Sequence, residues 1–193
     1  CSSDLGGGSS NAFSILKFLI KKKTKRKVIL KLMDTVGSDL KLFLYNLGYL
    51  KNIRKVIKIK NKIKLNFLLI YPNFKCSTKD IYSKVLKYSK REKFLNKNFS
   101  NKSKLINYII NSNNDLQKVV KIKYPIITNI LKDVRQLDGC ILSRMTGSGS
   151  VCYGLFNNEN CSKAALKNLR NKYPKFSFSI AKRSEEHTSE LQS

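Results

Sequence analysis

Residues 139–180 read GCILSRMTGSGSVCYGLFNNENCSKAALKNLRNKYPKFSFSI, and they hold the most regular pattern in the chain. Apolar residues dominate 139–143 and 151–156, and Gly147-Ser148-Gly149-Ser150 between them is typical of a tight turn. Residues 160–173 have helical spacing, whereas 176–180 alternate apolar and polar residues like a half-buried strand. The order strand, glycine loop, strand, helix, strand predicts an α+β fold.

The segments before residue 139 add further helices and strands. Thr78 is the predicted N-cap of one of these helices, and Pro125 separates the last two. Helices are expected at 28–36, 78–88, 104–111, 115–123 and 126–137, and strands at 42–45, 56–59 and 63–71.

A glycine-rich segment, Gly6-Gly7-Gly8-Ser9-Ser10-Asn11, comes just before the apolar run at 13–20. A glycine turn that opens a helix favours phosphate binding, because the first N–H groups of the helix are free and its dipole attracts anions. A flexible Gly/Ser linker would have the same composition. From this segment alone both interpretations remain open, and no Gly-Lys-Ser/Thr follows to make it a Walker loop.

The chain is strongly basic, with 39 Lys+Arg, 12 Asp+Glu and a formal charge of +27. Such a charge suggests a nucleic-acid or anionic-membrane partner. The lysines, however, alternate with Ile, Leu, Asn and Tyr throughout, and only 21–27 forms a dense run. We therefore favour a basic surface that follows from AT-rich codon usage, with nucleic-acid binding as the alternative. No apolar run reaches the roughly 18 residues of a membrane-spanning helix, so no membrane partner is expected.

The cysteines lack the spacing of metal ligands. We expect reduced thiols packed as small apolar residues, and hence a cytoplasmic protein, for Cys76, Cys140, Cys152 and Cys161.

Both ends of the chain depart from its general composition. Residues 1–5 and 183–193 resemble translations of common sequencing adapters, and the second segment holds the one histidine of the chain. We therefore leave both segments out of the fold prediction and expect residues 1–3 and 183–193 to make few tertiary contacts.

Three segments in fixed order carry a resemblance to one family. The segments LGGGSSNA at 5–12, GSDL at 37–40 and RMTGSGSV at 144–151 resemble those of the 4-diphosphocytidyl-2-C-methyl-D-erythritol kinases, members of the GHMP class of small-molecule kinases. Weaker matches lie at 71–73, 77–78, 114–116 and 154–156.

The resemblance implies a two-lobed α+β GHMP kinase fold that lacks the first part of its N-terminal lobe. Residues 6–72 would be the remainder of the N-terminal ATP-binding lobe, and residues 73–182 the C-terminal lobe. The family's active-site lysine precedes the glycine loop, so we expect this chain alone to be inactive. Another GHMP kinase and a basic nucleic-acid-binding module are the alternatives.

The resemblance also implies the chemistry, which is transfer of a phosphoryl group from ATP, with Mg²⁺, to the 2-hydroxyl of 4-diphosphocytidyl-2-C-methyl-D-erythritol in the non-mevalonate isoprenoid pathway. Asp39 would be the catalytic base. Tyr82 would stack on the cytosine, although a core-packed helix residue is an equal alternative at this position. The implied binding residues are Gly6, Gly7, Gly8, Ser9, Ser10 and Asn11 for the ATP phosphates, and Thr78, Tyr82, Gly147, Ser148 and Gly149 for the substrate.

Overall fold

The computed structural model describes residue 12 and residues 14–15, 26–36, 40, 48–52, 55–58, 63–89 and 101–183. The chain divides into two compact units. The first comprises Cys1–Lys62, Lys93–Asn101 and Ser184–Ser193, and the second comprises Ile63–Glu92 and Lys102–Arg183.

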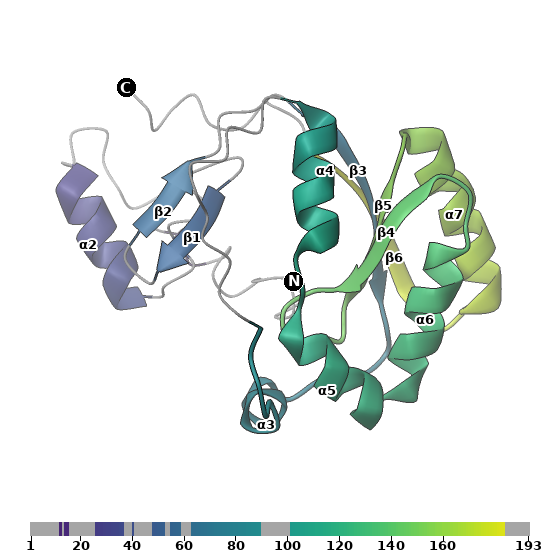
Figure 1. Cartoon of the computed structure of the whole chain (residues 1–193), viewed down its shortest axis with the longest axis horizontal. Coiled ribbons are helices and arrows are strands. Elements are labelled where there is room, and N and C mark those ends of the chain that lie inside the picture. Colours follow the sequence, from purple (N-terminus) through teal and green to yellow (C-terminus); the bar gives the residue numbers. More distant parts are fainter. Residues whose placement is uncertain are drawn as a thin grey trace. The chain divides into compact units, whose positions relative to one another are not determined.

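In the first unit the structure describes one main helix and a hairpin (Figure 1). Helix α2 spans Arg26–Val36 and buries Met33, while Val28 and Leu32 are exposed. Strands β1 (Gly48–Asn52) and β2 (Lys55–Lys58) pair antiparallel, with Tyr49 opposite Ile57.

The second unit is built on a four-stranded antiparallel sheet in the order β4-β5-β3-β6. Its strands are β3 (Leu65–Tyr71), β4 (Cys140–Met145), β5 (Cys152–Phe156) and β6 (Ser177–Arg183). Several helices connect β3 to β4, a tight loop connects β4 to β5, and one helix connects β5 to β6. This β-α-β-β-α-β connectivity with that strand order is a ferredoxin-like arrangement.

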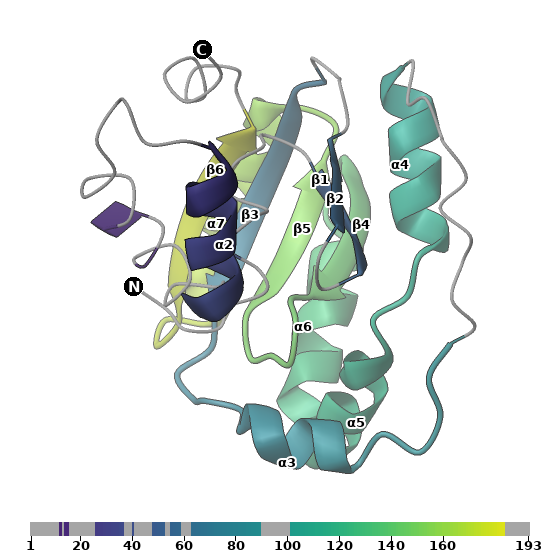
Figure 2. The same ribbon diagram turned by 90° about the vertical axis from the view of Figure 1, so that its left-hand side faces the viewer.

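The helices of this unit pack mainly on one face of the sheet. Figure 1 shows α6 and α7 covering that face, with α5 beside α6 and α3 next to α5. Figure 2 shows α4 at the β4 edge, where the Arg144 side chain donates hydrogen bonds to the Ile109 and Ile110 carbonyls. The bounds of the helices are Thr78–Ser83 for α3, Lys102–Asn111 for α4, Asp115–Lys123 for α5, Pro125–Arg135 for α6 and Glu159–Lys172 for α7.

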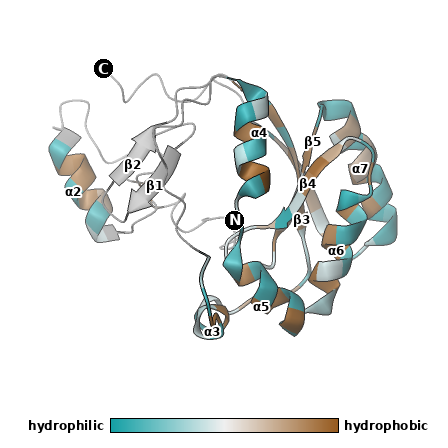
Figure 3. Cartoon of the chain, in the orientation of Figure 1, coloured by the Kyte–Doolittle hydropathy of each residue, from teal (hydrophilic) through white to brown (hydrophobic). Residues whose placement is uncertain are grey.

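The core of the second unit lies between the sheet and α5, α6 and α7. These helices carry both hydrophilic and hydrophobic residues (Figure 3), and their apolar residues pack against the strands. Gly154 lets α6 approach β5 closely, since a Cβ at this position would lie 2.8 Å from the Val134 Cγ1 atom. The largest fully buried side chains of this core include Leu68, Ile70, Ile127, Ile130, Met145 and Phe156.

The elements from α4 to β6 begin and end within a few residues of their predicted bounds. Helix α3 is shorter than the predicted 78–88, because the chain leaves the helix at Lys84. The predicted cap was also wrong by one residue, because the side chain of Ser77, rather than that of Thr78, accepts from the Asp80 N–H. The predicted strand at 42–45 lies outside the described residues.

The boundary between the units also differs from the predicted one. Strand β3 pairs with β5 and β6, so the second unit begins at Ile63 rather than at residue 73. At the other end, β6 includes Arg183, which lies opposite Leu65, one residue beyond the predicted limit. Both differences have the same origin, because β3 and β6 are neighbours in one sheet although they are far apart in sequence.

Candidate functional site

The glycine loop between β4 and β5 is a closed turn. The Thr146 N–H donates to the Val151 carbonyl at 2.8 Å, and the Gly149 N–H donates to the Thr146 carbonyl at 2.9 Å. Gly147 and Gly149 have φ values of +44° and +84°, which L side chains rarely adopt. The predicted tight loop is therefore confirmed, and both of its glycines occupy left-handed backbone conformations that favour glycine.

Two side chains at the start of α5 hold the loop from one side. The Asn114 Nδ2 donates to the carbonyl of Met145 at 3.1 Å and to that of Gly147 at 2.8 Å. The Gln117 Oε1 accepts from the Met145 N–H at 2.9 Å. These hydrogen bonds hold the backbone of Met145 and Gly147 against the start of α5.

A third contact ties the loop to the segment that leads into α3. The Ser150 hydroxyl donates to the Phe74 carbonyl at 2.5 Å, and the Phe74 ring stacks on Tyr124 with centroids 4.9 Å apart. Ser150 is one of only two buried polar residues in the described part of the chain, so this hydrogen bond satisfies a hydroxyl that water cannot reach.

Helix α3 brings the predicted substrate residues to the same place. The Thr78 and Ser148 hydroxyl oxygens lie 3.0 Å apart and share a hydrogen bond. Tyr82 follows Thr78 by one helical turn, so both lie on one side of α3. Its side chain is 51% exposed, which excludes the alternative that Tyr82 packs in the core.

An ion-pair cluster around Asp80 anchors α3 to α5. The Lys84 ammonium lies 2.8 Å from one Asp80 carboxylate oxygen, and the Lys123 ammonium contacts the other. Hydrogen bonds from Lys123 and then Lys84 lower the pKa of the Asp80 carboxyl. Below this cluster Ile81 is fully buried, so one apolar side chain and one charged group together fix a helix of only six residues.

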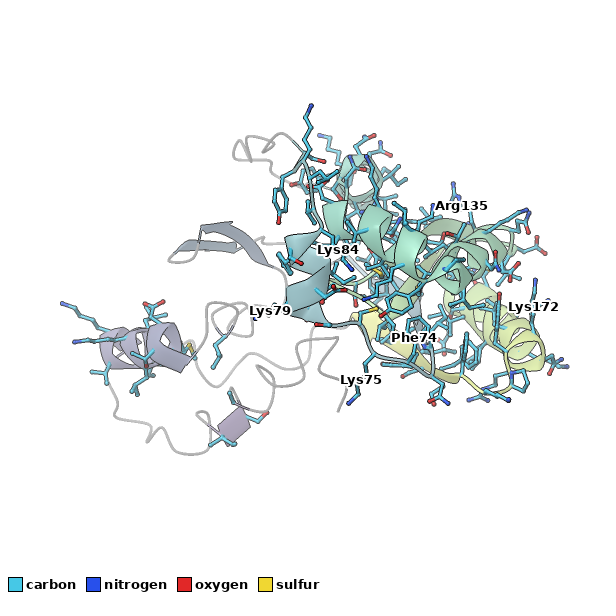
Figure 4. The ribbon with its side chains drawn as sticks, turned by 90° about the horizontal axis from the view of Figure 1, so that it is seen from below. Phe74, Lys75, Lys79, Lys84, Arg135 and Lys172 are labelled. Atoms are coloured by element: carbon cyan, nitrogen blue, oxygen red, sulfur yellow. The ribbon has the colours of Figure 1, made fainter. Side chains whose placement is uncertain are left out.

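Positive charge is spread over separate elements. Figure 4 shows Lys75 and Lys79 beside Phe74 at the start of α3, whereas Arg135 and Lys172 lie at the ends of α6 and α7.

The structure describes five of the predicted site residues, and it brings the two predicted substrate segments together. Thr78 and Tyr82 lie on α3, and Gly147, Ser148 and Gly149 form the loop that Thr78 contacts. The other predicted residues, Gly6 to Asn11 and Asp39, lie outside the described residues. The roles of all of them in binding and catalysis remain predictions.

Sequence reasoning missed the supports of the glycine loop. Asn114 was noted only within a weak match at 114–116, and neither Gln117 nor Ser150 had been assigned a role. Each lies far from its partner in the chain, so the sequence offered only two amide side chains near a predicted helix start and one hydroxyl in the predicted turn.

Over the described ranges no group of three or more His, Cys, Asp or Glu side chains could hold a metal ion. A search of the same residues for a helix long and apolar enough to cross a membrane found none.

Comparison with known proteins shows which family the chain resembles. Residues 91–175 match the family model described as GHMP kinases C terminal. The 4-diphosphocytidyl-2-C-methyl-D-erythritol kinase of Pelagibacter ubique (strain HTCC1062) is 38% identical over 176 residues. The chain thus resembles GHMP kinases over most of its length. The same-named kinase of the Wolbachia of Brugia malayi (strain TRS) is 31% identical over 181 residues, which are 91% of this chain and 62% of the relative.

Solved structures show the same fold. A crystal structure of 4-(cytidine 5'-diphospho)-2C-methyl-D-erythritol kinase aligns with a TM-score of 0.65 at 20% identity, over 91% of this chain and 65% of that one. A homoserine kinase from Cytophaga hutchinsonii aligns with a TM-score of 0.62 at 12% identity, over 83% and 58% of the two chains. The predicted α+β GHMP kinase fold is thus confirmed. The chain spans about three fifths of the length of its Pelagibacter relative, with 88% of its own length aligned to 60% of that protein.

Proposed function

We propose that the protein is a kinase that transfers the γ-phosphoryl group of ATP to the 2-hydroxyl of 4-diphosphocytidyl-2-C-methyl-D-erythritol. The observation that carries this proposal is the hydrogen bond between Thr78 and Ser148, which joins the two segments predicted to bind the substrate. The names of the relatives at 38% and 31% identity support the same substrate.

Phosphoryl transfer depends mainly on positioning and on neutralising charge, so the protein must offer donors to phosphate oxygens. The Gly147 and Ser148 N–H groups make no hydrogen bond to another described residue, and Gly147 is exposed. We assign these N–H groups and the Thr78 hydroxyl to phosphate oxygens of the bound substrate. Lys79, which follows Thr78 and is exposed, adds positive charge on the same helix.

The remaining roles belong to residues outside the described ranges. Gly6 to Asn11 would bind the phosphates of ATP, and Asp39 would accept the proton of the attacking hydroxyl. Mg²⁺ would neutralise charge on the nucleotide. The described residues contain no fitting set of carboxylates, so we assign no ligand to the metal and derive no step through it.

Tyr82 is the residue we assign to the nucleobase. A half-exposed ring on a helix anchored at both Thr78 and Asp80 offers a flat surface at a fixed position. Stacking of a base on an aromatic ring is worth about 1–3 kcal/mol, so Tyr82→Ala should weaken binding of cytidine 5'-diphosphate by roughly 5- to 150-fold. Tyr82→Phe retains the ring and should bind like the wild type.

Calorimetric titration of the chain with cytidine 5'-diphosphate tests this assignment. The matched control is Tyr88→Ala, because Tyr88 is also exposed, at 56%, but lies beyond the end of α3. Equal affinities for Tyr82→Ala and Tyr88→Ala would refute the role of Tyr82. A wild-type chain that binds no cytidine 5'-diphosphate would refute the substrate assignment itself.

A further inference from the structure

We infer that Asn114 is a positioning residue that sets the direction of the Ser148 N–H in the glycine loop. This inference rests on the proposed function, because it explains how that loop presents a donor to a phosphate oxygen. Asn114 is the N-cap residue of α5, and its side chain contacts the backbone of the loop.

The Asn114 side chain makes three hydrogen bonds of two kinds. Its Oδ1 accepts from the Leu116 N–H at 3.1 Å and so caps α5. Its Nδ2 donates to the Met145 and Gly147 carbonyls at 3.1 and 2.8 Å. Only one orientation of the amide satisfies this set, since a flipped amide would place oxygen against two carbonyl oxygens.

The contact with the Gly147 carbonyl controls the next N–H group. The Gly147–Ser148 peptide bond is trans, since the one cis bond found among the described residues is Gly149–Ser150. In a planar trans peptide the C=O and N–H groups point in opposite directions. Holding the Gly147 oxygen against Asn114 therefore turns the Ser148 N–H away from α5.

Among the described residues, the Gly147 C=O and Ser148 N–H groups of this peptide make no hydrogen bond other than the one from Asn114. Gly147 has φ +44° and open space where a Cβ would lie, with no atom within 4 Å. The Gly149 N–H closes the turn onto the Thr146 carbonyl, a bond that involves neither group of the Gly147–Ser148 peptide. Because glycine rotates readily, loss of the Asn114 donor would free this peptide to rotate.

Asn114→Asp separates the two tasks of the side chain. A carboxylate retains the oxygen that caps α5, so the helix should remain capped. It cannot donate, and its second oxygen would repel the Met145 and Gly147 carbonyls. The chain offers a matched control in Asn158, which caps α7 through the Cys161 N–H at 2.9 Å and contacts no loop carbonyl by its amide nitrogen.

The experiment compares Asn114→Asp and Asn158→Asp in the 193-residue chain. Nitrogen-15 NMR of the Ser148 amide should show a shifted and broadened signal only in Asn114→Asp. Titration with cytidine 5'-diphosphate should show at least a tenfold loss of affinity in that variant and less than a twofold change in Asn158→Asp. Asn114→Ser, which retains a cap and at most one donor, should fall between, and it stands in if Asn114→Asp fails to fold.

The outcomes separate this inference from the proposed function. An unchanged Ser148 signal in Asn114→Asp or Asn114→Ser would overturn the inference, whatever the ligand result. A changed signal with wild-type affinity would overturn the role of Asn114 in binding. A wild-type chain that binds no cytidine 5'-diphosphate would count against the proposed substrate, and the NMR comparison would still decide whether Asn114 orients the amide.

Discussion

Replacing Gly149 by alanine should be one of the most damaging single-methyl changes in the second unit. Gly149 is buried at φ +84°, and an added Cβ would lie 2.8 Å from the Met145 Sδ and 3.2 Å from the Cys76 Sγ. A left-handed backbone costs an L residue about 1–2 kcal/mol. Overpacking of a buried site typically costs about 1–3 kcal/mol more, and the reduced freedom of the unfolded chain offsets about 0.4–1 kcal/mol, so we expect a loss of roughly 1–4.5 kcal/mol in the free energy of unfolding.

Gly147→Ala is the matched comparison at the same loop. Its φ of +44° is also left-handed, but no atom lies within 4 Å of an added Cβ. The left-handed backbone still costs the alanine variant about 1–2 kcal/mol. Alanine also restricts the unfolded chain more than glycine does, which offsets about 0.4–1 kcal/mol of this cost. We therefore expect a loss of roughly 0–1.5 kcal/mol at this position.

Urea unfolding followed by far-ultraviolet circular dichroism at 25 °C measures both values through the shift in midpoint at constant slope. The difference between the two variants isolates the collision with Met145, because both share the backbone term. Equal losses in the two variants, or a smaller loss for Gly149→Ala, would show that the packing around Gly149 is not as described.

Two further changes are expected to have measurable effects. Asp133→Asn removes a carboxylate that accepts hydrogen bonds from Lys172 at 2.7 Å and from the Tyr173 hydroxyl. Burial raises the pKa of the Asp133 carboxyl, but these two hydrogen bonds outweigh it, so the pKa is lowered overall. A lowered pKa stabilises the fold above the ordinary value of about 4 and loses that effect as pH falls through the folded-state value. The variant should therefore lose about 1–2 kcal/mol at pH 7, and its stability should fall less steeply than that of the wild type as pH drops below about 4, as urea midpoints across pH would show. Asp39→Asn, made in a chain extended to the length of its Pelagibacter relative, should reduce turnover by about 10²–10⁴-fold with ATP affinity retained, and unchanged turnover in a coupled kinase assay would remove the base assignment.

Much of the second unit follows from local pattern. The alternation at 176–180 and the turn sequence at 147–150 predict β6 and the β4–β5 loop, because half-buried strands and left-handed glycines leave direct signatures in sequence. Helices α5 and α7 likewise follow from helical spacing. These elements depend mainly on neighbours in the chain.

The parts that sequence reasoning placed wrongly depend on distant partners. Apolar spacing extends the predicted helix past Lys84, but the chain leaves α3 there, and Ser89 donates its N–H and hydroxyl to the Asp115 carboxylate on α5. Strand β3 falls within residues 6–72, which the family resemblance implied to be the N-terminal lobe. Its partners, β5 and β6, come about 85 to 110 residues later, and only their pairing assigns β3 to the second unit.

Asn114 and Asn158 show where the limit of sequence reasoning lies. Each precedes an acidic residue and a helix, and each accepts from an N–H of the first turn, so local sequence makes them equivalent N-caps. They differ in which N–H group they cap, Leu116 for Asn114 and Cys161 for Asn158, and in what the amide nitrogen contacts. That of Asn114 reaches the Gly147 carbonyl 33 residues along the chain, because α5 begins beside the β4–β5 loop. The difference between a simple cap and a residue that orients a donor in the site therefore arises at the level of tertiary packing, and exchanging each asparagine for aspartate measures that difference.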